Sequence, residues 1–315
     1  MKEILMKFIK NKPLMVLMVT SIVISILEPR FLTTGNLMTI LRQTSINAVI
    51  ATGMTFVILV GGIDLSVGSV LGFTGAIAAT MISGGTNIVV VILTVLILGT
   101  FIGFVNGSLI TIGRLQPFIA TLGTVTLLRG LLLVFSQGRP IGTGNTEGSE
   151  LFNAIGRGFF GPIPIPVYLM LFIFIIAYYM LNHTRMGRYI YSTGSNEEAT
   201  MYSGIKTNRV KLFVYAASGM MASIAGVLIT ARLGSAQPTA GAGYELDAIA
   251  AVVLGGTSMA GGIGTITGTA IGALIIGVLN NALNIMQVSS YYQDVAKGIV
   301  ILVAVLMDRK KKASR

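Results

Sequence analysis

A charged stretch between two apolar runs is the feature that most constrains the fold of this chain. Residues 185–211 (RMGRYIYSTGSNEEATMYSGIKTNRVK) include seven charged side chains. VYLMLFIFIIAYYML precedes them at residues 167–181, and LFVYAASGMMASIAGVLI follows at 212–229. Both runs are apolar enough to cross a bilayer as helices. The charged stretch is therefore predicted to be a loop between two membrane spans, because charges collect outside the hydrocarbon region.

The composition indicates an integral membrane protein. Of the 315 residues, 53% are hydrophobic and 10% are charged, whereas a soluble domain carries about 25% charged residues. The apolar runs lack the polar/apolar alternation of barrel strands, so the spans are expected to be helices. The net charge of +11 does not predict nucleic-acid binding, since the basic residues gather near span ends, where they set topology and contact membrane lipids.

Several kinds of chemistry lack the residues they need. The sequence has no cysteine, which excludes disulfides, thiolate catalysis and Cys-based metal sites. It also lacks the G-x-x-x-x-G-K-[ST] motif of P-loop ATPases. The single histidine, His183, stands at the end of a span and is expected to be structural. We expect no catalytic residue, no cofactor and no metal site.

Ten apolar stretches predict an all-α polytopic protein in which residues 1–315 form one transmembrane domain. The first follows a basic flank, as in a signal peptide, but no small-x-small cleavage site is evident, so we expect a retained span. The ten stretches are approximately residues 13–27, 45–61, 65–82, 87–110, 118–135, 166–181, 212–232, 244–256, 265–286 and 291–307.

The even number of predicted spans puts both termini on one side of the membrane. If that side is cytoplasmic, 15 of the 22 Lys and Arg residues lie in cytoplasmic segments. Cytoplasmic loops carry an excess of basic residues, so both termini and the loop at 185–211 are predicted to be cytoplasmic. The loop at 136–165 is then external, with a short interfacial helix expected at 149–160. It is either a plain connector or part of a landing surface for an external binding protein.

The two parts of the chain resemble each other. Asp64 and Asp247 are each followed eight residues later by a glycine, Gly72 and Gly255. Five spans in each half, roughly residues 1–165 and 166–315, require opposite orientations, so we expect inverted halves unless glycine-rich helices match by chance. Doubled G-x-x-x-G rows predict close helix packing, within the subunit or at a dimer face: Gly99, Gly103 and Gly107 in the first half, and Gly264, Gly268 and Gly272 in the second.

Two polar motifs interrupt the apolar sequence. GGIDLSVGS holds Asp64, which either caps the third span or borders a translocation path. The segment at 243–262 holds Asp247, and its apolar part is too short to cross the membrane, which predicts a break or a gate. Asparagines in the fourth and ninth spans join helices or offer hydrogen bonds to a polyhydroxylated solute. The candidate residues of the path or gate are Asp64, Ser66, Asn106, Asp247, Asn280 and Asn281.

The charged loop contains the pattern of a short helix at residues 195–205. Asn196 is a good N-cap, and Glu197 and Glu198 occupy the first turn, where the helix dipole favours negative charge. Gly204 is a plausible end of this helix. The helix either connects two spans or is a docking site for a soluble partner.

The motifs GGIDLSVGS, TGSNEEATMYSGI and ELDAIAAVVLGGTSMAGGIGT with GVLNNALN resemble the ribose-type permeases of bacterial monosaccharide ABC importers. This resemblance covers nearly the whole chain. It implies an ABC-importer permease fold in the cytoplasmic (inner) membrane, a second permease copy, an ABC ATPase and a periplasmic or lipid-anchored sugar-binding protein. It assigns ATPase coupling to Asn196, Glu197, Glu198, Ala199 and Gly204.

The expected function is inward transport of a monosaccharide, with ribose as the first candidate. One alternative is a permease of the same type for xylose, galactose or another small sugar-like solute. A second is an ion-coupled secondary transporter. The spans lack the series of ionisable residues that a proton relay needs, which counts against it. An intramembrane enzyme would need a nucleophile and base pair that the sequence does not offer.

Overall fold

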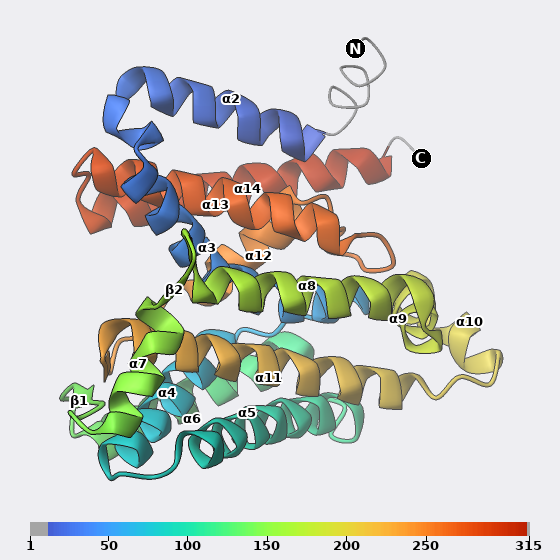
Figure 1. The fold of residues 1–315 in the computed structure, drawn as a ribbon. Coiled ribbons are helices and arrows are strands. Elements are labelled where there is room, and N and C mark those ends of the chain that lie inside the picture. Colours follow the sequence, from blue (N-terminus) through green and yellow to red (C-terminus); the bar gives the residue numbers. More distant parts are fainter. Residues whose placement is uncertain (1–11, 314–315) are drawn as a thin grey trace.

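Helices make up most of the computed structural model, which describes residues 12–313 (Figure 1). The first part of the chain forms α2 (Lys12–Leu27), η1 (Pro29–Leu32), α3 (Thr34–Leu59), α4 (Val67–Ser83), α5 (Ile88–Thr111), α6 (Pro117–Ser136), β1 (Ile141–Gly142), α7 (Glu147–Arg157), β2 (Phe159–Phe160) and β3 (Ile163–Pro164). The second part forms α8 (Ile165–His183), α9 (Arg185–Ser195), α10 (Glu197–Tyr202), α11 (Thr207–Leu233), β4 (Ser235–Ala236), α12 (Tyr244–Leu254), α13 (Ile266–Ile285) and α14 (Ser290–Ala313).

Each of the ten predicted stretches overlaps a helix, although α3 begins well before the stretch predicted at 45–61. Among the described residues, five helices are long and apolar enough to cross a membrane by themselves: α5, α6, α8, α11 and α13. The apolar helices α2 and α4 are shorter. The chain is therefore a multi-pass helical membrane protein. Lys2, Lys7, Lys10 and Arg315, which contribute to the topology prediction, lie outside the described residues.

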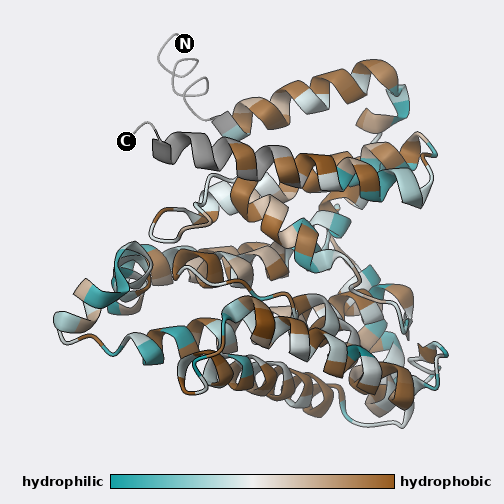
Figure 2. Cartoon of the chain, turned by 180° about the vertical axis from the view of Figure 1, so that it is seen from behind, coloured by the Kyte–Doolittle hydropathy of each residue, from teal (hydrophilic) through white to brown (hydrophobic). Residues whose placement is uncertain are grey.

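The helices α3 and α11 form the centre of the bundle. The helix α11 packs against α3, α4 and α5, and every residue of α3 from Ala48 to Leu59 is buried. A helix that is apolar on all sides is expected in such a central position. The outer helices α5, α6 and α8 expose apolar side chains instead, such as Phe101, Phe135 and Ile175, and are coloured largely hydrophobic in Figure 2. These faces suit contact with lipid tails.

The short elements gather at the two ends of the bundle. One end carries α9 and α10, and the described parts of α2 and α14 begin and end there (Figure 1). The opposite end carries α7 and the strands. Antiparallel pairing of Ile141 with Ala236 joins the segment after α6 to the segment after α11. The predicted helix at 149–160 is found slightly earlier, as α7, because it ends at Gly158 before the β2–β3 hairpin.

The charged loop differs from its prediction. The sequence predicts one short helix in residues 185–211, but the structure has two, α9 and α10, separated at Asn196. The side chain of Thr184 accepts a hydrogen bond from the backbone N–H of Gly187 and caps α9. Asn196 has an extended backbone and caps α10, which interrupts the helix between them.

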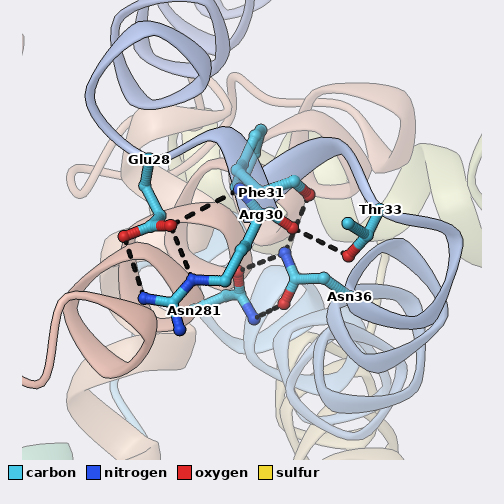
Figure 3. A network of polar contacts seen from close by, with 6 residues as sticks. All are labelled: Glu28, Arg30, Phe31, Thr33, Asn36 and Asn281. Atoms are coloured by element: carbon cyan, nitrogen blue, oxygen red, sulfur yellow. Dashed lines mark hydrogen bonds and ion pairs between the residues drawn. The ribbon is translucent and has the colours of Figure 1, made fainter.

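A polar network holds the turn between α2 and α3 (Figure 3). Arg30 donates from Nε to Oε1 of Glu28 at 2.8 Å, inside η1 and its cap. Asn36 and Asn281 exchange two amide hydrogen bonds of 3.0 and 2.8 Å between α3 and α13. Asn281 was expected at the translocation path, but its side chain connects α13 to the start of α3 by these hydrogen bonds.

Candidate functional site

Two short helices, α4 and α12, begin beside each other inside the bundle. A Cβ atom on Gly68, the second residue of α4, would overlap the carbonyl oxygen of Gly241 and Oε2 of Glu245, the second residue of α12. With 17 and 11 residues, these helices extend about 26 and 17 Å, less than the ~30 Å of a bilayer core. Both follow a long helix through a non-helical segment, residues 60–66 after α3 and 234–243 after α11.

The first polar cluster surrounds Asp64. One carboxylate oxygen, Oδ1, accepts from the backbone N–H and the hydroxyl of Ser66, at 3.0 and 2.6 Å, and Oδ2 accepts from the hydroxyl of Ser218 at 2.8 Å. Asn106 donates to the Ser66 hydroxyl at 2.9 Å and accepts from Thr124 at 2.6 Å. The chain of bonds joins the start of α4 to α5, α6 and α11.

Asp64, Ser66 and Asn106, three of the candidate path residues, meet in this cluster. The prediction that Asp64 caps the third span is wrong in detail. The N-cap of α4 is Ser66, and its side chain makes no capping bond. Asp64 lies two residues earlier and accepts the Ser66 N–H in an Asx turn. Ser218 and Thr124 were missed, because single hydroxyls in apolar helices give no distinctive sequence signal.

The second polar cluster surrounds Asp247 in α12. Its Oδ2 atom accepts from Nζ of Lys297 at 3.3 Å, Nδ2 of Asn280 at 3.2 Å and Nδ2 of Asn47 at 3.4 Å. Asp247 is buried, with a side-chain exposure of 3%. The cluster thereby ties α12 to α3, α13 and α14. The sequence analysis named Asp247 and Asn280 and missed the other two, although Lys297 is the one basic residue within the tenth apolar stretch.

The two clusters share a plan but have different electrostatics. Each places a carboxylate at the start of a short helix and an asparagine on the following long helix, Asn106 of α5 or Asn280 of α13. Asp64 is bonded to hydroxyl and backbone groups, whereas Asp247 has a cationic partner. Asp64 bonds to Ser66 and Ser218, and Asp247 bonds to Asn47, Asn280 and Lys297, so the two clusters are separate. The remaining candidate path residue, Asn281, bonds to Asn36 and belongs to neither cluster.

The glycine rows allow close helix approach. In the first row, a Cβ on Gly103 would overlap the backbone of Tyr215 in α11, and Gly99 and Gly107 face the same helix. In the second row, Gly268 and Gly272 face the backbone of α12 or its end, at Gly255 and Ala251. Gly264 faces Thr257 just beyond α12. Both rows pack within the subunit. The first row joins α5 of the first part of the chain to α11 of the second part, and the second row joins α13 to α12, both in the second part.

The helix α10 projects from one end of the bundle (Figure 1). Asn196 accepts from the Ala199 N–H at 2.9 Å, which is the expected N-cap bond. Lys211 of α11 donates to Glu197 at 2.6 Å, while Glu198 and Ala199 are exposed. Gly204 has φ +81°, a left-handed conformation that favours glycine and ends the helix.

Two exposed apolar side chains on α10 were not predicted. Tyr202 is 87% exposed and Met201 is 55% exposed. Aromatic and methionine side chains are enriched in protein interfaces. Their position at the end of a short projecting helix is a feature that the charge pattern of the loop did not reveal.

The neighbouring helix α9 contacts the glycine-rich segment that joins α12 to α13, residues 255–265. Tyr191 donates its hydroxyl to the carbonyl of Gly264 at 2.8 Å. A Cβ on Gly194 would overlap the Leu59 carbonyl and approach the Gly262 nitrogen. The Gly262 N–H donates to the same Leu59 carbonyl at 2.9 Å. The loop that carries α10 is therefore in direct contact with the segment that follows a short internal helix.

In the described part of the chain, no three or more His, Asp or Glu side chains lie close enough together to hold a metal ion. His183 stacks on Tyr179, with ring centroids 5.4 Å apart. This contact at the end of α8 agrees with the structural role expected for the histidine.

Comparisons with known proteins agree on the kind of protein. A family model described as "Branched-chain amino acid transport system / permease component" matches residues 36–305. The chain is 54% identical to the ribose import permease protein RbsC of Haemophilus influenzae, over 95% of this chain and 93% of that protein. It is 54% identical to the Escherichia coli protein of the same name and 53% identical to that of Bacillus subtilis, over 96% of this chain and 94% of each relative.

No solved structure matches the chain. The family model covers most of the sequence, and the three relatives match it almost from end to end. This chain therefore belongs to the family of permease components of membrane transport systems.

Proposed function

We propose that this chain is the membrane-spanning permease subunit of an ATP-driven ABC importer that moves a monosaccharide into the cytoplasm. Ribose is the proposed substrate. The observation that carries this proposal is the 53–54% identity to three ribose import permeases over at least 93% of both chains. The residues of the bundle support it, since the polar groups near α4 and α12 include neutral hydroxyls and amides that suit a sugar.

The chain acts in this proposal as a transport subunit and not as an enzyme. Its sequence contains no P-loop motif, so ATP hydrolysis falls to a separate ABC ATPase. An external sugar-binding protein delivers the solute. The end of the bundle that carries α7 offers a surface for it, because Leu151 and the hairpin residues Phe159 and Phe160 are exposed there.

The proposed topology has ten spans in two inverted halves, with both termini in the cytoplasm. Support comes from the repeated order of a long helix, a non-helical segment and a short helix, in α3–α4 and again in α11–α12. The beginnings of α4 and α12 lie side by side, as expected when inverted repeats place a pathway near their interface. We treat the whole chain as one transmembrane domain, since α11 packs extensively on helices of the first half.

In the proposed coupling mechanism, α10 docks on the ATPase and α9 transmits the movement. The exposed Glu198, Met201 and Tyr202 provide the docking surface. A displacement of α9 would act on residues 255–265 through Tyr191 and Gly194. That segment connects α12 to α13, so it can change the position of the short helix next to the Asp247 cluster.

The proposal also includes a second permease copy and membrane lipids. An apolar groove of about 470 Å³ lies between α8 and α11 and is lined by residues such as Phe172, Ile176 and Met220. Lipid chains suit this groove and the exposed apolar faces of α5 and α6.

Native mass spectrometry of the detergent-extracted complex tests the expected pair of permease copies.

Reconstitution tests the function. The chain is placed in proteoliposomes with its ATPase, and external binding protein loaded with labelled ribose, xylose or galactose is added. We expect ATP-dependent ribose accumulation. Preference for another sugar would reassign the substrate and keep the importer, whereas uptake driven by an ion gradient without ATP would favour a secondary transporter.

A further inference from the structure

Unpartnered polar atoms collect on one face between α3 and α13. Within residues 12–313, seven buried side-chain nitrogen or oxygen atoms have no hydrogen-bond partner. Three of the seven belong to this region: Oγ1 of Thr44, Oδ1 of Asn47 and Oδ1 of Asn280. Buried polar groups are nearly always satisfied in proteins, so a cluster of exceptions on two facing helices calls for an explanation.

The orientation of the two amides is determined by Asp247. A carboxylate accepts hydrogen bonds and does not donate them, so Asn47 and Asn280 must direct their NH2 groups toward it, at 3.4 and 3.2 Å. Their carbonyl oxygens consequently point elsewhere and find no donor. Rotating either amide would place its oxygen against the carboxylate, where two acceptors repel each other.

The helices are closely packed at this point. A Cβ on Gly277, one turn before Asn280, would overlap the hydroxyl of Thr44. Thr44 therefore lies at the contact between α3 and α13, and the two free amide oxygens are buried as well. A solute can reach them when α12 and α14 separate from α3 and α13, as alternating access at an inverted-repeat interface requires.

The donor and acceptor types define the class of ligand. The Thr44 hydroxyl can donate and accept, and the two amide oxygens are acceptors. A sugar hydroxyl also donates and accepts. The charges of Asp247 and Lys297 are paired with each other at 3.3 Å, so they leave no free ionic partner for the zwitterion of an amino acid.

We propose that Thr44, Asn47 and Asn280 form the site at which the permease binds a neutral polyhydroxylated solute during transport. This inference rests on the proposed function for its solute class and goes beyond it by assigning the residues. Solute hydroxyls satisfy the unpartnered atoms, so binding favours the conformation in which α3 and α13 are accessible.

The test measures thermal unfolding of the purified full-length permease in detergent, with increasing ribose or, as the competing chemistry, leucine. Ligand binding to the folded state raises the unfolding temperature. We expect ribose to stabilise the wild type and leucine not to do so. Asn47→Leu and Asn280→Leu should each weaken the apparent affinity for ribose roughly tenfold, by removing one buried hydrogen bond.

Asn281→Leu is the matched control. It is the residue after Asn280, but its amide nitrogen and oxygen both bond to Asn36 (Figure 3). This variant is expected to unfold at a lower temperature and still respond to ribose with wild-type affinity. Asn47→Ser, which is shorter but polar, replaces Asn47→Leu if the leucine variant does not fold.

The possible results separate this site from the proposed function. Stabilisation of all variants with equal affinity, stabilisation by leucine and not ribose, or no stabilisation at all would each overturn the site. ATP-driven ribose uptake by the wild type is measured in parallel. If the wild type takes up ribose but the variants keep their ribose affinity, the site is wrong and the importer function stands. If the variants lose ribose affinity but the wild type shows no uptake, the site stands and the importer function is wrong.

Discussion

Nζ of Lys297 lies 3.3 Å from Oδ2 of Asp247 and joins α14 to α12 within the helix bundle. The lysine is 25% exposed and the aspartate 3%. Removing one partner of such a pair leaves an uncompensated charge, whereas removing both does not. The pair therefore links the last long helix to the short helix at the centre of the proposed pathway.

Lys297→Met is expected to lower the free energy of unfolding by about 3–5 kcal/mol, because Asp247 then lacks its counter-charge. The double variant Asp247→Asn/Lys297→Met should recover most of this loss, since Asn47 and Asn280 can still donate to the new amide oxygen. Denaturant unfolding in detergent measures both. Equal stability of the single variant and the wild type would contradict a structural role for the pair.

Gly103→Leu and Gly268→Leu are each expected to destabilise the fold by at least about 3 kcal/mol, because the new side chain meets backbone atoms that cannot move aside. The matched control is Gly123→Leu in α6, where a Cβ would have no neighbour within 4 Å. Membrane yield and thermal unfolding are the measurements. If all three variants behave alike, close approach at Gly103 and Gly268 is not required.

Glu198→Arg reverses a charge in the exposed first turn of α10, and Gly204→Val places a β-branched residue at φ +81°. Both changes should preserve membrane insertion but abolish ATP-driven uptake, through weak docking in the first case and a misplaced helix in the second. Glu150→Arg in α7, at the opposite end, should leave ATPase pull-down unchanged. Normal uptake by both α10 variants would reduce the loop to a connector.

Tyr202→Ala should weaken binding of the ATPase by about 2 kcal/mol, or roughly thirtyfold, as expected for an aromatic residue at the centre of an interface. Tyr292→Ala provides the comparison, because Tyr292 is also exposed, at 71%, but lies near the start of α14. Titration of the purified permease with ATPase measures the two affinities. An unchanged affinity for Tyr202→Ala would place the docking surface elsewhere.

Reporter fusions after Gly144 should be external, and fusions after Asn196 or Arg315 should be cytoplasmic. The expectation follows from the basic residues of the predicted cytoplasmic segments and from the even number of spans. Figure 1 supports the relative placement, since α7 lies at the end opposite α9 and α10. A cytoplasmic signal at Gly144 would contradict the ten-span arrangement.

The sequence by itself determined the long apolar helices and the kind of protein. Apolar runs of span length form helices almost regardless of their neighbours, because backbone groups in a bilayer must be bonded within the segment. The predicted stretches at 87–110 and 265–286 accordingly differ from α5 and α13 by one residue at each end. The cap at Asn196 and the turn at Gly204 were also predictable, since both depend on local backbone chemistry.

Only the tertiary structure decided which polar residues meet. Asn280 and Asn281 are neighbours in the chain, yet successive residues point about 100° apart on a helix, so one contacts Asp247 and the other Asn36. Lys297 and Asn47 join the same carboxylate from residues 50 and 200 positions away. The packing of α3, α12, α13 and α14 brings these groups together, and the sequence distance between them left no local pattern from which to predict it.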